Sequence, residues 1–295
     1  MKIIHSPSSM ATWSRRLRRE GVVIGLVPTM GALHEGHRAL IREARLNCDA
    51  LVVSIFVNPT QFAPNEDLAA YPRRISQDRR LCRDEGVDAC FEPTADGMYP
   101  QGFQTVITPA SIARRWEGES RPRHFAGVAT VVTKLFSIVG PEIAWFGQKD
   151  FQQYAVIKQL VTDLNLGIRL IVRPTVREPD GLALSSRNVF LSAEERRLAP
   201  TLYDALVAGQ RVIEKGATDP QAVETTMRDV LSGQPAIRID YLAVCDPNTL
   251  EPLHRIEREA VLLAAIRLGT VRLIDNVIAK RKPVRIALRG DTRRP

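Results

Sequence analysis

The sequence lacks several features that would place it in a common class of protein. Its 295 residues contain four cysteines and no C-x-x-C pair, which argues against a disulfide framework and a cysteine-rich zinc module. No run approaches about 18 apolar residues, and the first apolar stretch is short, so we expect neither a membrane span nor a signal peptide. Walker A and G-x-G-x-x-G motifs are absent, which counts against P-loop kinases and Rossmann dehydrogenases. The scattered cysteines fit a reducing cytosol, so we expect a cytoplasmic protein.

The composition is that of a folded protein with one large domain or two modest ones. Hydrophobic residues make up 44% and charged residues 25% of the chain, both ordinary values. The net charge is +8, but residues 280–295 hold seven basic residues and one acidic residue. Because most of the excess lies in this terminal tail, which we expect to be flexible, we do not expect a nucleic-acid partner.

Short β-branched runs alternate with amphipathic stretches over the first 176 residues. This alternation predicts a parallel sheet with helices on both faces. The predicted strands are 22–27, 50–57, 89–91, 143–146 and 169–172, and the predicted helices are 37–46, 74–85, 127–139 and 150–164.

The pattern changes after residue 176. One long helix is expected over 193–215, beginning after an N-cap at Ser192. A second helix is expected around 219–231, followed by strands at 237–244, 261–266 and 271–274. We therefore predict an α/β domain over 1–176, a smaller α+β domain with an antiparallel sheet over 177–279, and a basic tail over 280–295.

The first chemical motif is PTMGALHEGH at 28–37, between a predicted strand and a predicted helix. Ligands of open α/β sheets bind beyond the carboxyl ends of the strands, and a helix N-terminus suits phosphate. Two glycines let a phosphate approach the backbone, and His34 and His37 can donate hydrogen bonds to it. The alternatives are a structural histidine pair, an ordinary glycine-rich turn and a metal site, although H-x-x-H is not a zinc-protease spacing.

Four more polar motifs follow along the chain. NPTQF at 58–62 can read a small polar acid or form a plain turn. RPRHFAGV at 121–128 is a substrate loop or only the start of a helix. WFGQKDFQQ at 145–153 places Lys149 beside phosphate, with Asp150 as a ribose ligand or a helix cap. GLALSSRN at 181–188 is a triphosphate clamp or a surface turn. Taken together, the motifs indicate a polyphosphate site.

These motifs, with RLIDN at 272–276, resemble the pantothenate synthetase (pantoate–β-alanine ligase) family of the HIGH-motif nucleotidyltransferase superfamily. The resemblance covers about residues 1–279. Arg123 stands where the family more often has Gly, and Gln148 where Glu is also common.

The resemblance implies a Rossmann-like N-terminal domain, a C-terminal lid domain and a homodimer. It implies condensation of pantoate with β-alanine through a pantoyl adenylate, with ATP and Mg²⁺. The catalytic residues would be His34 and His37 on phosphates, with His37 as the acid, and Lys149 as the phosphate-neutralising residue. The implied ATP site consists of Met30, Gly31, Ala32, Leu33, His34, Glu35, Gly36, His37, Gly147, Gln148, Lys149, Asp150, Val176, Leu184, Ser185, Ser186 and Arg187.

The same resemblance implies a site for the acid. Gln61 would hold pantoate and lie near β-alanine, and Gln153 would hold pantoate. Asn58 and Arg121 would join them, and Asp78 would support the metal. Two alternatives stay open: a related nucleotidyltransferase acting on a phosphorylated acceptor, and a non-enzymatic nucleic-acid-binding protein that uses the basic tail.

Overall fold

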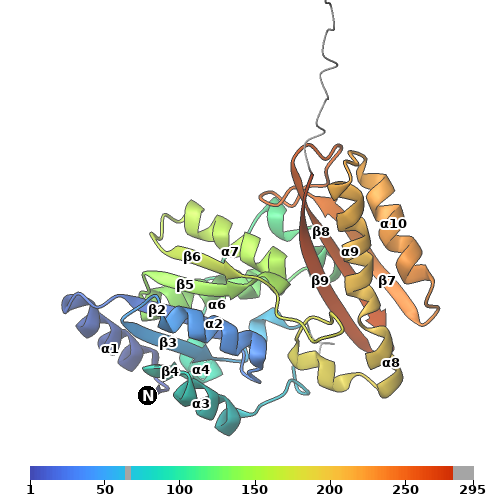
Figure 1. The fold of residues 1–295 in the computed structure, drawn as a ribbon. Coiled ribbons are helices and arrows are strands. Elements are labelled where there is room, and N and C mark those ends of the chain that lie inside the picture. The colour runs from blue at the N-terminus through green and yellow to red at the C-terminus, as the bar shows by residue number, and fades with distance from the viewer. Residues whose placement is uncertain (64–67, 282–295) are drawn as a thin grey trace, which may run out of the picture. The chain divides into compact units, whose positions relative to one another are not determined.

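The computed structural model describes residues 1–63 and 68–281, which form two compact units with their boundary between Pro200 and Thr201 (Figure 1). The first unit therefore includes residues 177–200. The predicted division at residue 176 follows the change in the pattern of predicted elements, and it stays a prediction.

A six-stranded parallel sheet forms the centre of the first unit. Its strand order is β1-β4-β3-β2-β5-β6, and every neighbouring pair is parallel. The strands are β1 (Lys2–Ile4), β2 (Ile24–Thr29), β3 (Ala50–Ile55), β4 (Ala89–Phe91), β5 (Ile143–Gly147) and β6 (Arg169–Arg173). The predicted α/β class with a parallel sheet is confirmed.

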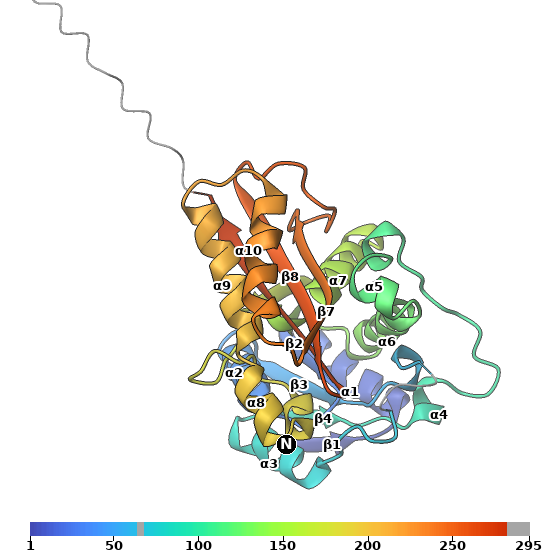
Figure 2. The ribbon, with the colours of Figure 1, turned by 90° about the vertical axis from the view of Figure 1, so that its right-hand side faces the viewer.

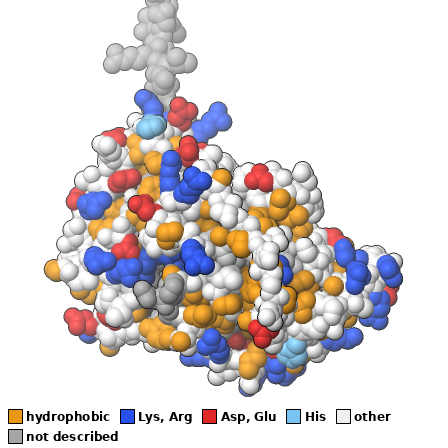
Figure 3. Space-filling view, turned by 180° about the vertical axis from the view of Figure 1, so that it is seen from behind, with side chains coloured by type: hydrophobic (Ala, Val, Ile, Leu, Met, Phe, Trp, Pro, Cys, Tyr) orange, Lys and Arg blue, Asp and Glu red, His pale blue; other side chains and the backbone are white. Residues whose placement is uncertain are grey.

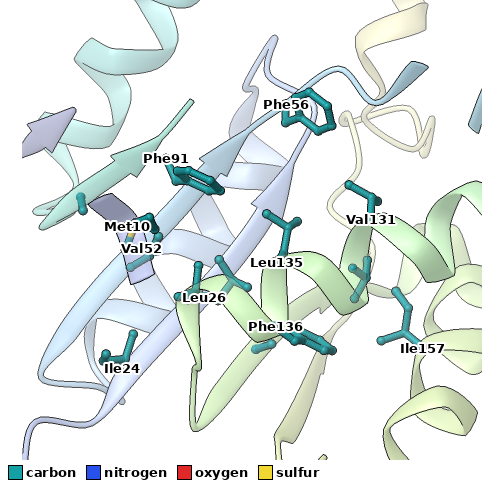
Figure 4. Packing of buried hydrophobic residues seen from close by; sticks show 14 of the residues in the cluster. Met10, Ile24, Leu26, Val52, Phe56, Phe91, Val131, Leu135, Phe136 and Ile157 are labelled. Atoms are coloured by element: carbon teal, nitrogen blue, oxygen red, sulfur yellow. The ribbon is translucent and has the colours of Figure 1, made fainter. Parts of the chain in front are cut away.

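Helices cover both faces of this sheet because successive strand residues point to opposite sides. Leu26 packs in a cluster with α1, α6 and Ile157 of α7, whereas Val27 packs with α2 and α3. Figure 4 shows Leu135 and Phe136 of α6 among the residues of the first cluster. The helices of this unit are α1 (Pro7–Arg19), α2 (Glu35–Arg45), α3 (Ile75–Asp84), α4 (Ala95–Met98), α5 (Glu117–Ser120), α6 (His124–Val139), α7 (Phe151–Asp163) and α8 (Ala193–Leu198), with 3-10 turns η1 (Pro59–Gln61), η2 (Ser111–Ala113), η3 (Gln148–Asp150) and η4 (Ser186–Phe190).

The second unit has an antiparallel sheet in the order β7-β8-β9. Its elements are α9 (Thr201–Glu214), α10 (Pro220–Ser232), β7 (Ile237–Cys245), β8 (Glu259–Leu268) and β9 (Val271–Lys280). Figures 1 and 2 both show α9 and α10 side by side along this sheet. The predicted antiparallel sheet is confirmed, with longer second and third strands.

The prediction of one helix over 193–215 is wrong. The structure has two helices, α8 and α9, which are separated by Ala199 and Pro200. Pro200 has no backbone N–H to donate to the carbonyl four residues earlier, and its ring crowds that carbonyl. The predicted cap is correct: the Ser192 hydroxyl accepts from the backbone N–H of Glu195 at 3.2 Å.

Charges of both signs are interspersed on the surface drawn in Figure 3. Of the predicted basic tail, Lys280 ends β9, and Arg281 donates to the carbonyl of Gly216 at 3.1 Å. The rest of the tail lies outside the described residues. Within the described parts of the chain, none of the helices has the length and apolar character that a membrane crossing needs.

Candidate active site

The carboxyl ends of the parallel strands bring the main predicted motifs to one edge of the sheet. β2 lies between β3 and β5. The chain continues from β2 to β3 on one side and later returns to β5 on the other, so the strand order reverses at β2. Ligands of open α/β sheets bind at such a reversal. The loops that follow these three strands, 30–37, 56–61 and 148–150, define the candidate site.

The loop after β2 adopts a backbone that needs outside support. Gly31 has φ of 82° and Ala32 has φ of 49°, a left-handed conformation that is uncommon for a residue with a Cβ. The buried carboxylate of Asp78, in α3, accepts from the backbone N–H of Ala32 at 2.9 Å and of Leu33 at 2.8 Å. Asp78 therefore holds the strained part of the loop from the neighbouring helix.

The surroundings of Asp78 do not match a resident metal site. Each of its carboxylate oxygens already accepts a backbone N–H. Burial raises the pKa of this carboxyl, and the two hydrogen bonds only partly oppose that effect. Among the residues that the structure describes, no group of three or more His, Cys, Asp or Glu side chains is placed to hold a metal ion. The metal-supporting role of Asp78 stays a prediction that these contacts do not favour.

His34 and His37 cap the N-terminus of α2. The backbone N–H of Gly36 donates to Nδ1 of His34 at 3.2 Å, and that of His34 donates to Nδ1 of His37 at 3.3 Å. A neutral ring whose Nδ1 accepts carries its proton on Nε2. The capping contacts thus assign an Nε2–H to each ring. The structural and the phosphate-binding interpretations are compatible, because capping leaves one N–H donor on each histidine.

Both imidazoles are neutral at pH 7. Desolvation and, to a lesser extent, the nearby charge of Lys149 together lower the pKa of His34 from 6.5 to about 4. Desolvation and the adjacent His34 lower the pKa of His37 from 6.5 to about 3. An anion at this helix end would therefore meet neutral N–H donors and the partial positive charge of the helix.

Lys149, in η3 directly after β5, supplies a cation beside these histidines. Its Nζ lies 3.5 Å from a carboxylate oxygen of Asp150. Desolvation would raise the pKa of Asp150, but the charges of Lys149 and Arg187 outweigh it and lower that pKa. Asp150 takes the N-cap position of α7 without a side-chain capping bond. A Cβ built on Gly147 would meet no atom within 4 Å, so the backbone here borders open space.

Gln61 joins the loop after β3 to the loop after β2. Its Nε2 donates to Sδ of Met30 at 2.9 Å, and its Oε1 accepts from Nδ2 of Asn58 at 3.1 Å. Its backbone carbonyl accepts from Arg121 at 3.1 Å and lies 3.0 Å from Nδ1 of His124. The structure thus brings together the predicted acid-site residues Asn58, Gln61 and Arg121, because Asn58 and Arg121 both contact Gln61.

Gly127 allows α6 to approach this cluster closely. A Cβ at this position would lie 2.5 Å from the carbonyl oxygen of Thr60 and 2.7 Å from Cα of Gln61. The carbonyl of Gly127 also accepts from Nδ2 of Asn58 at 3.2 Å. Residue 127 must therefore be glycine if η1 is to keep its place.

The segment with the paired serines lies against Tyr71. The hydroxyls of Tyr71 and Ser186 are 3.3 Å apart, and the guanidinium of Arg187 lies 5.9 Å from the centre of the Tyr71 ring. The hydroxyl of Ser185 accepts from the backbone N–H of Arg187 at 3.3 Å. These contacts and the charge effect on Asp150 place Arg187 near the Lys149 loop.

The remaining predicted residues lie in the three loops or next to them. Gln153 is partly buried in the first turn of α7, and Gln148 begins η3. The carbonyl of Val176 accepts from the N–H of Leu184 at 3.0 Å. Glu35 is exposed.

Three contacts were not anticipated from the sequence: Asp78 on the loop after β2, Tyr71 on the serine segment, and Tyr99 on Asn58. The hydroxyl of Tyr99 donates to Oδ1 of Asn58 at 2.8 Å. No pattern near 71 or 99 marks either tyrosine, because each acts across a long sequence separation.

A family model and the similar curated proteins point to the same family. The model of the pantoate-beta-alanine ligase family matches residues 2–278. A pantothenate synthetase of Thermotoga petrophila is 48% identical over 278 residues, which are 94% of this chain and 99% of the relative. One of Chloroflexus aurantiacus is 50% identical over 277 residues, covering 94% of this chain and 97% of the relative.

Solved structures agree with these relatives. A pantothenate synthetase of Thermus thermophilus superimposes with a TM-score of 0.89 at 44% identity, over 94% of this chain and 99% of that one. A pantoate-beta-alanine ligase of Francisella tularensis, solved with beta-gamma ATP and beta-alanine, gives a TM-score of 0.77 at 36% identity, over 94% of this chain and 97% of that one.

Proposed function

The chain belongs to the pantoate–β-alanine ligase family, and from this we propose that it makes pantothenate by way of a pantoyl adenylate. A carboxylate oxygen of pantoate attacks the α-phosphorus of ATP, and pyrophosphate leaves. The amine of β-alanine then attacks the acyl carbon and loses a proton. AMP leaves and carries with it the pantoate oxygen that had attacked the α-phosphorus. The net reaction converts pantoate, β-alanine and ATP into pantothenate, AMP and pyrophosphate.

One contact supports this proposal most strongly: Nε2 of Gln61 lies 2.9 Å from Sδ of Met30. It sets an amide suited to a small acid directly against the loop suited to phosphates. Adenylation requires the carboxylate and the α-phosphorus to be held within reach of each other, and such positioning supplies much of the rate enhancement. Gln153 and Arg121 complete the acid side of our proposal, with Asn58 behind Gln61.

We assign the triphosphate to the loop after β2, to Lys149 and to the segment Leu184–Arg187. Negative charge grows on the phosphoryl oxygens and on pyrophosphate as the bond to the α-phosphorus breaks. Preorganised donors aimed at such charge are worth about 10²–10³-fold in rate for a single donor. Lys149 and Arg187 supply full charges, and His34 and His37 supply neutral N–H donors. Since His37 is neutral, it would serve the role of acid by donating a hydrogen bond from Nε2 to a phosphate oxygen, with no transfer of the proton.

The adenosine end of ATP takes the neighbouring positions in this proposal. Gly147 and Gln148 would border the nucleotide, Asp150 would accept from a ribose hydroxyl, and the backbone of Val176 would meet the adenine. The open space above Gly147 supports this placement. Mg²⁺ would enter as the counter-ion of ATP, bound to phosphates and water. We assign it no protein ligand and no separate step.

Three further properties belong to the proposal. Residues 177–279 would act as a lid over the adenylate, which water would otherwise hydrolyse. The chain would form a homodimer. It would work in the cytoplasm, which suits four cysteines that are not paired in disulfides.

ATP–pyrophosphate exchange with pantoate, in the absence of β-alanine, tests the proposal. We expect labelled pyrophosphate to enter ATP only when pantoate is present, and AMP to be released once β-alanine is added. No turnover with any combination of the three substrates would overturn the ligase proposal. Transfer of AMP to a phosphorylated acceptor would then favour the related nucleotidyltransferase.

A further inference from the structure

Asn58 lies at the centre of a chain of side-chain hydrogen bonds behind Gln61. It is 1% exposed. Its Oδ1 accepts from the hydroxyl of Tyr99 at 2.8 Å and from the hydroxyl of Thr60 at 3.0 Å. Its Nδ2 donates to Oε1 of Gln61 at 3.1 Å and to the carbonyl of Gly127 at 3.2 Å. Both ends of this buried amide are thus occupied within the protein.

These partners fix which way each amide points. The carbonyl of Gly127 can only accept, so it must face the NH₂ of Asn58, and the hydroxyls of Tyr99 and Thr60 then donate to the oxygen. The NH₂ of Asn58 in turn requires the oxygen of Gln61. If the Gln61 amide were reversed, two NH₂ groups would face each other, and a buried donor would lose its partner.

This orientation leaves the NH₂ group of Gln61 on the side of the amide that faces away from Asn58. Its NH₂ group is directed toward Sδ of Met30 at 2.9 Å. A thioether is a weak acceptor, so a carboxylate or hydroxyl oxygen of a substrate would be a better partner for the same N–H. With the amide reversed, its carbonyl oxygen would face the acid and repel it.

We propose that Tyr99 is a positioning residue for the acid substrate: acting through Asn58, it holds the Gln61 amide with its NH₂ group toward the acid. The inference rests on the proposed function, because it takes Gln61 as the residue that contacts pantoate. It adds Tyr99, which is linked to the side-chain amide of Gln61 by two successive hydrogen bonds through Asn58.

Tyr99 is well suited to this task because its ring is held on several sides. The ring packs edge to face with Phe103, with centroids 5.1 Å apart, and lies 6.3 Å from the Phe56 ring. The ammonium of Lys134 sits 4.7 Å from the Phe103 centroid and 5.8 Å from that of Tyr99. Burial raises the pKa of Tyr99, which keeps its hydroxyl a donor at neutral pH.

The test is Tyr99→Phe, which removes only the hydroxyl. We expect the KM for pantoate to rise roughly 2- to 10-fold, the effect of about one hydrogen bond, with the KM for ATP and the thermal midpoint nearly unchanged. Tyr154→Phe is the matched control, since Tyr154 packs against the same hydrophobic cluster as Tyr99. Thr60→Val removes the other hydroxyl on Asn58 and should shift the KM for pantoate in the same direction.

Combining Tyr99→Phe with Gln61→Ala separates positioning from a general structural effect. If Tyr99 acts through Gln61, its replacement should change the KM for pantoate little once Gln61 is Ala. Equal effects in both backgrounds, or a pantoate KM in Tyr99→Phe equal to that of the control, would overturn the inference. The wild-type enzyme is assayed alongside: if it forms no amide, the proposed function fails, whereas an active wild type with an unaffected Tyr99→Phe variant rejects this inference alone.

Discussion

Replacing Asp78 by Asn should loosen the phosphate-binding loop from behind. In the wild-type chain the two carboxylate oxygens accept the N–H groups of Ala32 and Leu33 at 2.9 and 2.8 Å. Asn has one oxygen and one NH₂ group, so one backbone donor would face another donor. Ala32, with φ of 49°, would lose part of the support for its left-handed backbone.

The magnitude follows from these two contacts. Leaving a buried donor unpaired costs about 1–3 kcal/mol, and replacing a charge-assisted bond with a neutral one removes roughly half of its strength, about 1 kcal/mol. Burial already raises the pKa of Asp78, so removing the charge returns some desolvation free energy. We therefore expect Asp78→Asn to lower the free energy of unfolding by about 2 kcal/mol.

Urea unfolding and ATP–pyrophosphate exchange measure the two effects of this variant. We expect the exchange rate at saturating substrates to fall at least about 10-fold, because a loop displaced by even about 1 Å misplaces its phosphate donors. Asp84→Asn is the matched control: Asp84 is exposed on the same helix, and among the described residues its ion pair is with Arg80 at 3.9 Å. If Asp78→Asn matched this control in both stability and exchange, the loop-holding role of Asp78 would be refuted.

Three further outcomes are expected. Lys149→Ala should lower kcat for pantothenate formation at least about 100-fold while urea unfolding stays unchanged; an unchanged kcat would remove Lys149 from the chemistry. Gly127→Ala should destabilise the chain by about 1–3 kcal/mol, since its Cβ would lie 2.5 Å from the carbonyl oxygen of Thr60; wild-type stability would show that α6 can move aside. His34 and His37 have pKa values of about 4 and 3 in the folded chain, against 6.5 as the reference for the unfolded chain. Below about pH 6.5 the unfolded chain therefore binds more protons than the folded chain. The free energy of unfolding should therefore decrease between pH 6.5 and 4, and less steeply in His37→Asn; identical slopes would contradict the neutral assignment.

Much of the fold was predictable because the hydrophobic pattern of a parallel sheet is strong. The buried strand β3 is apolar except for Ser54, and α6 shows helical spacing over its whole length. The pattern was weak at the N-terminus, where β1 has only three residues and α1 buries only Met10 and Ser14. Neither element was predicted. Pro200 is a signal for a helix break, but the helical spacing continues on both sides of it and therefore predicted a single helix.

The site was predictable where it follows the strand ends in order along the chain. Met30, Gln61 and Lys149 follow β2, β3 and β5, and the parallel topology brings those loops together. The residues that hold them were less accessible to sequence reasoning. Asp78 and Tyr99 act on loops far away in the sequence, and only the packing of α3 and of the residues after α4 makes those contacts visible.

The fate of the pantoate carboxylate oxygen tests the central claim most directly. Pantoate labelled with ¹⁸O in both carboxylate oxygens would be turned over with ATP and β-alanine, and the AMP would be analysed by mass spectrometry. The adenylate route predicts one ¹⁸O atom in AMP and one in the pantothenate amide for each turnover. Unlabelled AMP, with the label in pyrophosphate or phosphate instead, would show that the carboxylate does not attack the α-phosphorus, and it would contradict the proposed mechanism.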